Sequence, residues 1–170
     1  MSVDGETVKI NWEPQAGREP IQPIVGLLKD GRYGEAVLLM ELLLSHEPEH
    51  PDYLYNLGMA YSDLGDLDRA ISLLTQLVDR EPGHTNGHVA LGVAYMRAGK
   101  AEAAAKELET AVSQEPYNPW AHRNLGAVLG NLNQFDEAVT HLQRAAELNP
   151  DDQAAWYGLG QALEKVDQID

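Results

Sequence analysis

A period of 34 residues runs through most of this chain. Two series of residues repeat at this spacing, glycines at Gly58, Gly92, Gly126 and Gly160 and prolines at Pro48, Pro82, Pro116 and Pro150. A fixed period of this length indicates that one supersecondary unit has been copied, because a single helical hairpin cannot bury its apolar face without stacking on a neighbour. The period therefore predicts a solenoid.

Each copy contains the pattern of two helices. The first has an apolar stripe at helical spacing, formed by Leu57 and Tyr61 and their counterparts, and it ends before Gly65, Gly99 or Asn133, which suit a left-handed helix exit. The second has a stripe that begins at Ala70 and ends before the proline, which cannot continue a helix. We expect Gly58, Ala70 and their copies to lie where the two helices cross, because larger side chains there would overpack the crossing.

The period and the Leu-Gly, Tyr, Ala, Ala, Pro pattern resemble the tetratricopeptide repeat. The resemblance covers 51–152 completely and 153–170 for one helix, and it implies an all-α, right-handed α-solenoid of stacked antiparallel helix pairs. The predicted organisation is an N-terminal extended segment (1–20), a degenerate first repeat (21–50), repeats at 51–84, 85–118 and 119–152, and the first helix of a truncated repeat (153–170).

The degenerate repeat departs from the others in both of its helices. Proline at position 23 predicts a shortened first helix that begins near this residue, since proline is tolerated in an opening turn. The second helix carries Leu38 and Leu42 at outward positions. The equivalent residues in the other repeats are polar: Ser72, Gln76, Lys106, Thr110, Thr140 and Arg144.

A segment near the N-terminus is suited to cover these two leucines. Val8, Ile10 and Trp12 alternate with polar residues, as in a half-buried extended strand. We expect Leu38 and Leu42 to be buried by residues 8–12 or by another molecule, because apolar patches are usually buried or used.

At the other end, the sequence stops at Asp170, where a second helix is expected to begin. Trp156, Leu159 and Leu163 would then lack a hairpin partner. Solenoids normally end in a polar capping element. We therefore expect either that the 170 residues are part of a longer protein or that the last helix packs on another chain.

The charge of the chain disfavours two classes of partner. Its 27 acidic and 12 basic residues give a net charge of −15, without a basic region. Binding to nucleic acid or to an anionic membrane surface depends on clustered Lys and Arg, so neither partner is expected. The chain has no apolar run long enough to span a membrane and no signal-peptide pattern at its start, which favours a cytoplasmic location.

No catalytic, cofactor or metal site is predicted, and we do not expect an enzyme. The chain has no cysteine, which excludes disulfides and thiolate sites. His84 and His88 have the spacing of a helical metal pair, but the sequence places no third ligand; His88 and His122 share a repeat column with apolar residues, which favours a packing role. Gly158-Leu159-Gly160 begins like a dinucleotide loop, but no strand precedes it.

The family resemblance implies a concave groove, lined by the first helices, that holds a peptide or a helix of a partner protein. The positions expected to face it are Tyr55, Asn56, Met59, Val89, Ala90, Val93, Met96, Arg97, Trp120, Arg123, Asn124, Ala127, Tyr157 and Gln161. In an acidic chain, Arg97 and Arg123 would make the middle of the groove the least repulsive place for a negative ligand group. Trp120 and Arg123 are residue types that are enriched at interface hot spots.

One branch of this family captures the C-terminal carboxylate of chaperones with lysine, arginine and asparagine side chains. The corresponding positions here are Tyr55, Met59, Ala90, Trp120 and Asn124, which include no lysine, so the sequence does not support this activity. The leading hypothesis is a non-enzymatic interaction module that acts as a scaffold or adaptor. The alternatives are a self-assembling structural protein and the targeting arm of a larger protein.

Overall fold

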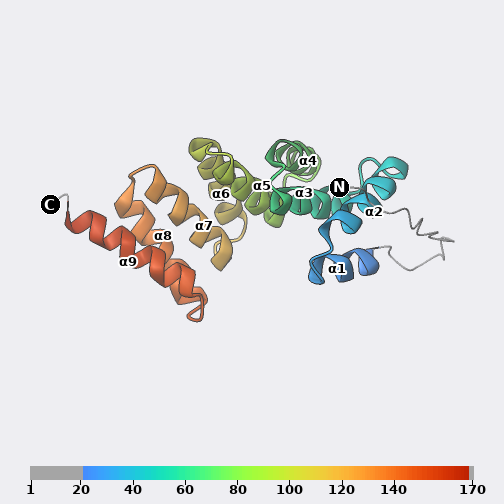
Figure 1. Cartoon of the computed structure of the whole chain (residues 1–170). Coiled ribbons are helices and arrows are strands. Elements are labelled where there is room, and N and C mark those ends of the chain that lie inside the picture. The colour runs from blue at the N-terminus through green and yellow to red at the C-terminus, as the bar shows by residue number, and fades with distance from the viewer. Residues whose placement is uncertain (1–20, 169–170) are drawn as a thin grey trace.

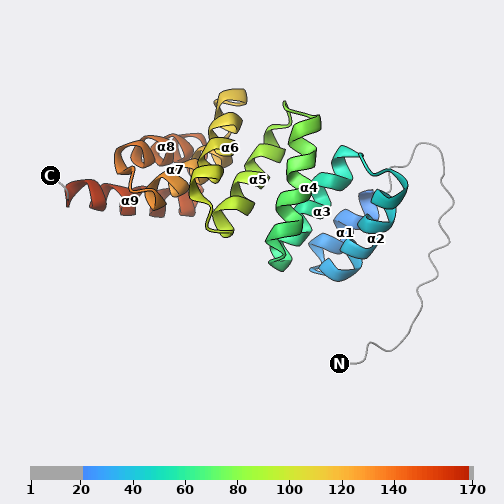
Figure 2. The ribbon, with the colours of Figure 1, turned by 90° about the horizontal axis from the view of Figure 1, so that it is seen from above.

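The computed structural model describes residues 21–168, which form nine α-helices. The helices are α1 (Ile21–Lys29), α2 (Tyr33–His46), α3 (Pro51–Leu64), α4 (Leu67–Arg80), α5 (Thr85–Arg97), α6 (Ala101–Gln114), α7 (Pro119–Asn131), α8 (Phe135–Leu148) and α9 (Gln153–Asp167). They are arranged in an elongated row, with α1 near one end and α9 at the other (Figures 1 and 2). The extended segment predicted for residues 8–12 lies outside the described residues.

Each first helix packs antiparallel against the second helix that follows it, and each second helix packs against the next first helix. This pattern joins α3 to α4, α4 to α5 and so on to α9, so that the apolar stripes form a continuous core. The prediction of an all-α solenoid of antiparallel helix pairs is confirmed. The helix α1 has nine residues, with Pro23 in its first turn, as the shortened helix of the degenerate repeat was expected to have.

The turns inside the pairs need a left-handed backbone. Gly65, Gly99 and Asn133 follow the first helices with φ values of 83°, 73° and 61°. After Gly65, the amide of Asp66 donates to the carbonyl of Tyr61 at 2.9 Å, which satisfies a carbonyl at the end of α3. These residues allow the chain to reverse within a few residues, and the second helix then lies directly beside the first.

The repeated glycines lie where the two helices of a pair come closest. A Cβ atom added to each of three glycines would meet the Cγ atom of a leucine on the second helix. The separations would be 2.7 Å for Gly58 and Leu74, 2.6 Å for Gly92 and Leu108, and 2.6 Å for Gly126 and Leu142. The glycine column therefore sets the helix separation, whereas Gly160 on α9 has open space where the other three have a leucine.

A second repeated contact uses a ring nitrogen on the first helix. The Nε2 atoms of His88 and His122 lie 2.9 Å and 3.1 Å from the carbonyl oxygens of Pro82 and Pro116, and Trp156 Nε1 donates to the Pro150 carbonyl at 2.9 Å. Both histidines are 7% exposed. The packing role that the sequence indicated for them is confirmed, because their buried rings connect α5 and α7 to the turns that precede these two helices.

The second ring nitrogen of each histidine meets a different partner in the two repeats. His88 Nδ1 lies 2.7 Å from Glu107 Oε2, whereas His122 Nδ1 lies 3.0 Å from Nδ1 of His141, which occupies the column of Glu107. Burial lowers the pKa of His141, and the nearby His122 lowers it further, although Glu137 on the same helix acts in the opposite direction. One hydrogen bond can join the two Nδ1 atoms only while one of them carries no proton.

We expect acidification to destabilise the fold through His141. Because its folded pKa lies below the unfolded value of about 6.5, the unfolded chain binds the proton more readily. The stabilisation is complete above that pH and is lost as the pH falls through the folded pKa. The urea concentration at the midpoint of unfolding should therefore decrease when the pH is lowered from 7.5 to 5.5. The decrease should be smaller in His141→Glu, because this variant recreates the His–Glu pair of the preceding repeat. An identical pH dependence in both proteins would contradict this assignment.

Candidate peptide-binding groove

The first helices form one face of the solenoid. Consecutive first helices pack directly against each other, α3 on α5, α5 on α7 and α7 on α9. Within residues 21–168, consecutive second helices have no contact of comparable extent. In a curved stack, the elements on the inner side lie closer together than those on the outer side. We therefore take the surface of α3, α5, α7 and α9 as the inner face and call it the groove.

The predicted groove residues differ in their exposure. Ala90 is buried, and the half-buried side chains are those of Tyr55, Asn56, Met59, Val89, Val93, Met96, Arg123 and Asn124. The exposed ones are Arg97, Trp120, Ala127, Tyr157 and Gln161. The half-buried apolar residues of α3 and α5 form a largely apolar surface, whereas the exposed residues lie mainly towards α9.

Tyr55 shows how the apolar part of the groove is held. Its ring lies 5.5 Å from the ring of His84, centroid to centroid, and burial raises the pKa of its phenol. His84 in turn accepts a hydrogen bond from the Gly87 amide through Nδ1 at 2.9 Å, which caps α5. Tyr55 is thus held beside the turn between α4 and α5 as a neutral phenol.

The two arginines of the groove have partners within the chain. Arg97 Nη1 donates to Ser62 Oγ at 3.0 Å and lies 3.4 Å from Asp63 Oδ1, and Arg123 Nη1 donates to Asp152 Oδ2 at 3.0 Å. The sequence predicts both arginines to be available to a negative ligand group. Instead, each guanidinium group is paired with a carboxylate, Arg97 with Asp63 on α3 and Arg123 with Asp152 at the start of α9, which cancels much of its field.

The Arg123–Asp152 pair is also part of the packing. The Asp152 side chain is only 9% exposed, and its Oδ1 accepts hydrogen bonds from the amides of Ala154 and Ala155 at the start of α9. A single carboxylate therefore caps one first helix and binds the arginine of the preceding one. Arg123, which the sequence predicted as a ligand-facing groove residue, therefore also contributes to the packing between helices α7 and α9.

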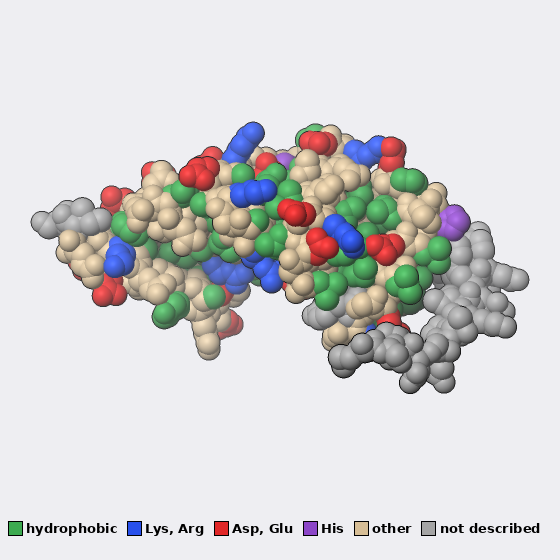
Figure 3. Space-filling view, turned by 45° about the horizontal axis from the view of Figure 1, so that its top comes forward, with side chains coloured by type: hydrophobic (Ala, Val, Ile, Leu, Met, Phe, Trp, Pro, Cys, Tyr) green, Lys and Arg blue, Asp and Glu red, His purple; other side chains and the backbone are tan. Residues whose placement is uncertain are grey.

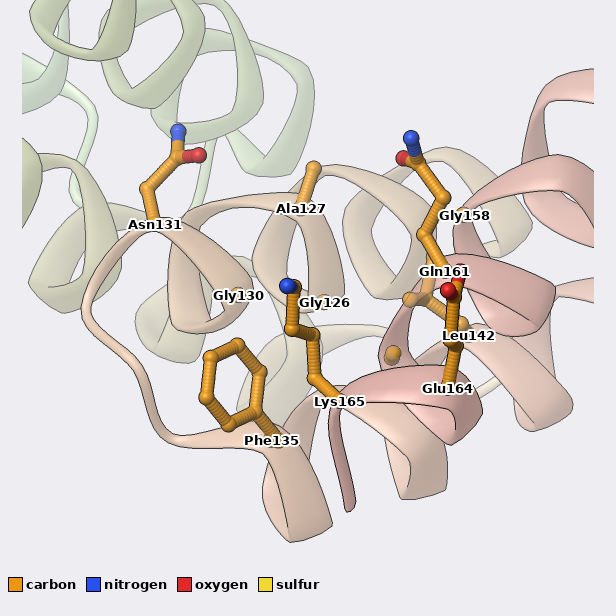
Figure 4. A pocket seen from close by; sticks show the side chains of 11 residues that line it. Gly126, Ala127, Gly130, Asn131, Phe135, Leu142, Gly158, Gln161, Glu164 and Lys165 are labelled. Carbon is orange, nitrogen blue, oxygen red and sulfur yellow. The ribbon is translucent and has the colours of Figure 1, made fainter. Parts of the chain in front are cut away.

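A pocket opens in the groove between α7 and α9. It has a volume of about 360 Å³, and Leu142 of α8 lies at its base (Figure 4). The remaining lining residues are Gly126, Ala127, Gly130, Asn131, Phe135, Gly158, Gln161, Ala162, Glu164 and Lys165. Figure 4 shows the Lys165 side chain between Phe135 and Leu142. The amide groups of Asn131 and Gln161 lie at the top of this view, away from the ring of Phe135.

The pocket exists because α7 has smaller side chains than α5 at equivalent positions. Ala127, Gly130 and Asn131 occupy the columns of Val93, Met96 and Arg97. Met96 packs against the core between α5 and α7, whereas a Cβ atom on Gly130 would meet no atom within 4 Å. The smaller side chains in these columns of the sequence are the signal from which the position of the pocket could have been predicted. Among its lining residues, only Ala127 and Gln161 are predicted groove residues.

The structure does not bring Trp120 to this pocket. Trp120 lies near the beginning of α7 and Gly130 near its end, about 15 Å apart along the helix axis. The tryptophan instead lines a separate cleft on the turn between α6 and α7, together with Tyr117. Trp120 and the pocket are therefore two separate features near opposite ends of α7.

The described part of the chain shows no arrangement for catalysis on a metal. Among residues 21–168, no three His, Asp or Glu side chains are grouped so that they could hold a metal ion. His84, one half of the spaced pair, has its Nδ1 occupied by the Gly87 amide. No helix in this range has the length and apolar character needed to cross a membrane.

Family comparison agrees with this architecture. Models of the tetratricopeptide repeat match residues 26–84, 55–119 and 95–163. The chain belongs to the tetratricopeptide repeat family, whose domains generally mediate protein–protein interaction and are typically non-catalytic. A comparison with curated proteins finds no match.

Several solved structures share the fold. TTC0263, a thermophilic tetratricopeptide repeat protein of Thermus thermophilus, is 27% identical with a TM-score of 0.75, over 86% of this chain and 81% of that one. MamA from MSR-1 is 27% identical with a TM-score of 0.72, over 85% and 83%. The first tetratricopeptide domain of Spaghetti (RPAP3), solved with the HSP90 peptide SRMEEVD, is 25% identical with a TM-score of 0.66, over 68% and 92%.

Proposed function

We propose that this protein is an interaction module that binds an extended or helical segment of a partner protein along the groove. The pocket between α7 and α9 would hold one apolar side chain of that segment. The observation that carries the proposal is this pocket, which lies on the row of first helices and not on the outer face. The apolar surface of Tyr55, Met59, Val89, Val93 and Met96 would receive the remainder of the ligand.

The chemistry of the pocket suits a peptide anchor. Its base and walls are Leu142, Phe135 and small residues, and its rim carries amide and charged groups. An apolar side chain would lose water contact inside, while Asn131 and Gln161 could bind the ligand backbone. A volume of about 360 Å³ is near the lower end of the range for ligand pockets, roughly 300–1,000 Å³, and is adequate for one or two side chains.

The dimensions of the groove set the length of the ligand. Packed helices lie about 10 Å apart, and an extended chain advances about 3.3 Å per residue. The four first helices would therefore contact a segment of about ten residues. A micromolar affinity is expected for a short, flexible ligand that becomes ordered on binding.

The RPAP3 domain supports peptide binding as a mode of action for this architecture, since its structure contains an HSP90 peptide. That peptide, SRMEEVD, carries several acidic residues. In this chain the corresponding clamp positions contain no lysine, both groove arginines are paired, and the net charge is −15. We therefore propose an apolar anchor, not an acidic C-terminal tail, as the recognised feature.

The test uses peptides selected by display on the full chain, followed by affinity measurements on two glycine variants. Gly130→Met restores the methionine of the preceding repeat and should fill the pocket, weakening the selected peptides at least tenfold, or about 1.4 kcal/mol. The helix should remain intact, because methionine favours a helix more than glycine does.

Gly160→Met is the matched control for this variant. It makes the same change on α9, where a Cβ atom likewise meets nothing within 4 Å, but Gly160 does not line the pocket. Binding should be retained. Equal affinity of the wild type and Gly130→Met for every selected peptide would contradict the assignment of the pocket.

Self-association is a second candidate function, favoured by one observation on α9. Trp156 and Leu163 are 52% and 45% exposed, whereas their counterparts His122 and Leu129 are 7% and 3% exposed beneath the second helix of their pair. A second copy could cover this face of α9. Sedimentation velocity over a range of concentrations tests this function, and Leu163→Ser should abolish any dimer that forms through α9.

A further inference from the structure

The N-terminal second helix exposes apolar side chains that no other second helix exposes at these positions. Leu38 and Leu42 of α2 are 70% and 53% exposed, one helical turn apart. The space-filling view shows hydrophobic side chains at several places on the surface of the N-terminal half, as well as on the C-terminal half (Figure 3). Adjacent exposed apolar side chains of this kind are usually buried or used in an interaction.

The repeat geometry shows which way Leu38 and Leu42 face. A cleft of about 550 Å³ separates α2 from α4, with Glu41, Leu44 and Ser45 on one wall and Arg69, Ser72 and Gln76 on the other. Leu38 and Leu42 occupy the columns of Ser72 and Gln76. They therefore form the wall of an equivalent cleft one repeat earlier, on the side of α2 that faces away from α4.

By the same repeat geometry, the opposite wall of that earlier cleft would come from the segment that precedes α1. In the later repeats, the segment before a first helix is a second helix that ends about one turn upstream, as Arg80 does before Thr85. Twenty residues precede α1, which packs against α2. In the repeat pattern, these residues would lie where the opposite wall of the cleft is expected.

The composition of this preceding segment matches the exposed pair. Val8, Ile10 and Trp12 would lie on one side of an extended chain, about 6.6 Å apart. Leu38 and Leu42 are four residues apart in a helix, which corresponds to about 6 Å along its axis. The stretch from Trp12 to the start of α1 spans up to about 30 Å when extended, which is ample reach to α2.

We propose that residues 8–12 dock in extended form over Leu38 and Leu42 of the same chain. The apolar side chains of the segment would then complete the N-terminal end of the solenoid on its outer face. This surface is separate from the groove, so the inference does not depend on the proposed peptide-binding function.

The absence of cysteine makes disulfide trapping in the full chain a direct test. The variant Ile10→Cys with Leu38→Cys should form an intramolecular disulfide under mild oxidation, seen as a monomer of altered mobility on a non-reducing gel. The matched control, Ile10→Cys with Thr140→Cys, has the second thiol in the same column on α8 and should remain reduced. The proposal would be overturned if all the disulfides that form are intermolecular. It would also be overturned if the control pair forms the intramolecular disulfide to the same extent.

Trp12 fluorescence gives a second readout that needs no cysteine. Its contribution is the difference between the spectra of the wild type and Trp12→Phe, since Trp120 and Trp156 are common to both. We expect a blue-shifted contribution that is independent of protein concentration and moves to the red when Leu38 and Leu42 are both replaced with serine. The segment does not dock there if the Trp12 emission of the wild type is already that of an exposed tryptophan. The same conclusion follows if replacing Leu38 and Leu42 with serine leaves the Trp12 emission unchanged.

Discussion

Gly92→Ala should destabilise the protein, whereas Gly160→Ala, the same change in the same repeat column, should stabilise it. The added Cβ atom at position 92 would lie 2.6 Å from Cγ of Leu108, and that leucine is fully buried. The two helices must then separate or the leucine must leave its rotamer, which costs about 1–3 kcal/mol in overpacked cores. At position 160 the Cβ atom meets nothing within 4 Å.

Helix propensity acts in the same direction at both sites and so does not explain a difference. Alanine is favoured over glycine in a helix by about 1 kcal/mol. The expected result is a gain of up to that amount for Gly160→Ala and a net loss for Gly92→Ala. The free energies of unfolding from urea titration, with helical content followed by circular dichroism, measure both. Two changes of the same sign would show that the glycine column does not set the helix separation.

Asp152→Ala should destabilise the protein strongly, because the carboxylate of Asp152 has two structural roles. The change removes the cap of α9, which typically contributes about 1 kcal/mol, and also the ion pair with Arg123. We expect a total loss of about 2–3 kcal/mol, because the pair is mostly buried and Arg123 would keep a guanidinium group without its partner. Asp152→Asn should lose less, since an amide oxygen can still cap the helix.

Arg123→Ala completes a double-mutant cycle with Asp152→Ala. We expect the two losses to be less than additive, because both variants break the same interaction. Trp120→Ala is the control from the same helix: its side chain is 54% exposed, and it should leave the unfolding midpoint nearly unchanged. Full additivity would mean that Arg123 and Asp152 do not stabilise each other, and Arg123 would again be available to a ligand.

The architecture of this protein can be predicted from its sequence alone. The 34-residue period, the leucine and alanine stripes and the left-handed exits at Gly65, Gly99 and Asn133 predicted the helix pairs and their stacking. Such a prediction succeeds because each feature acts over a few residues, through helical spacing or the backbone angle that one residue allows. Repetition then makes the same local signal visible several times.

The details of the groove were decided by the tertiary structure. The pairing of Arg123 with Asp152 and the pocket beside Gly130 each depend on helices that are distant in sequence. A column comparison shows that a side chain is smaller than its counterpart, but not whether a neighbour fills the space. Charge behaves similarly, since the field of an arginine depends on the carboxylate that packing places beside it. The family resemblance thus indicated which helices would line the proposed groove, and the packing between repeats determined the pocket and the electrostatics of this surface.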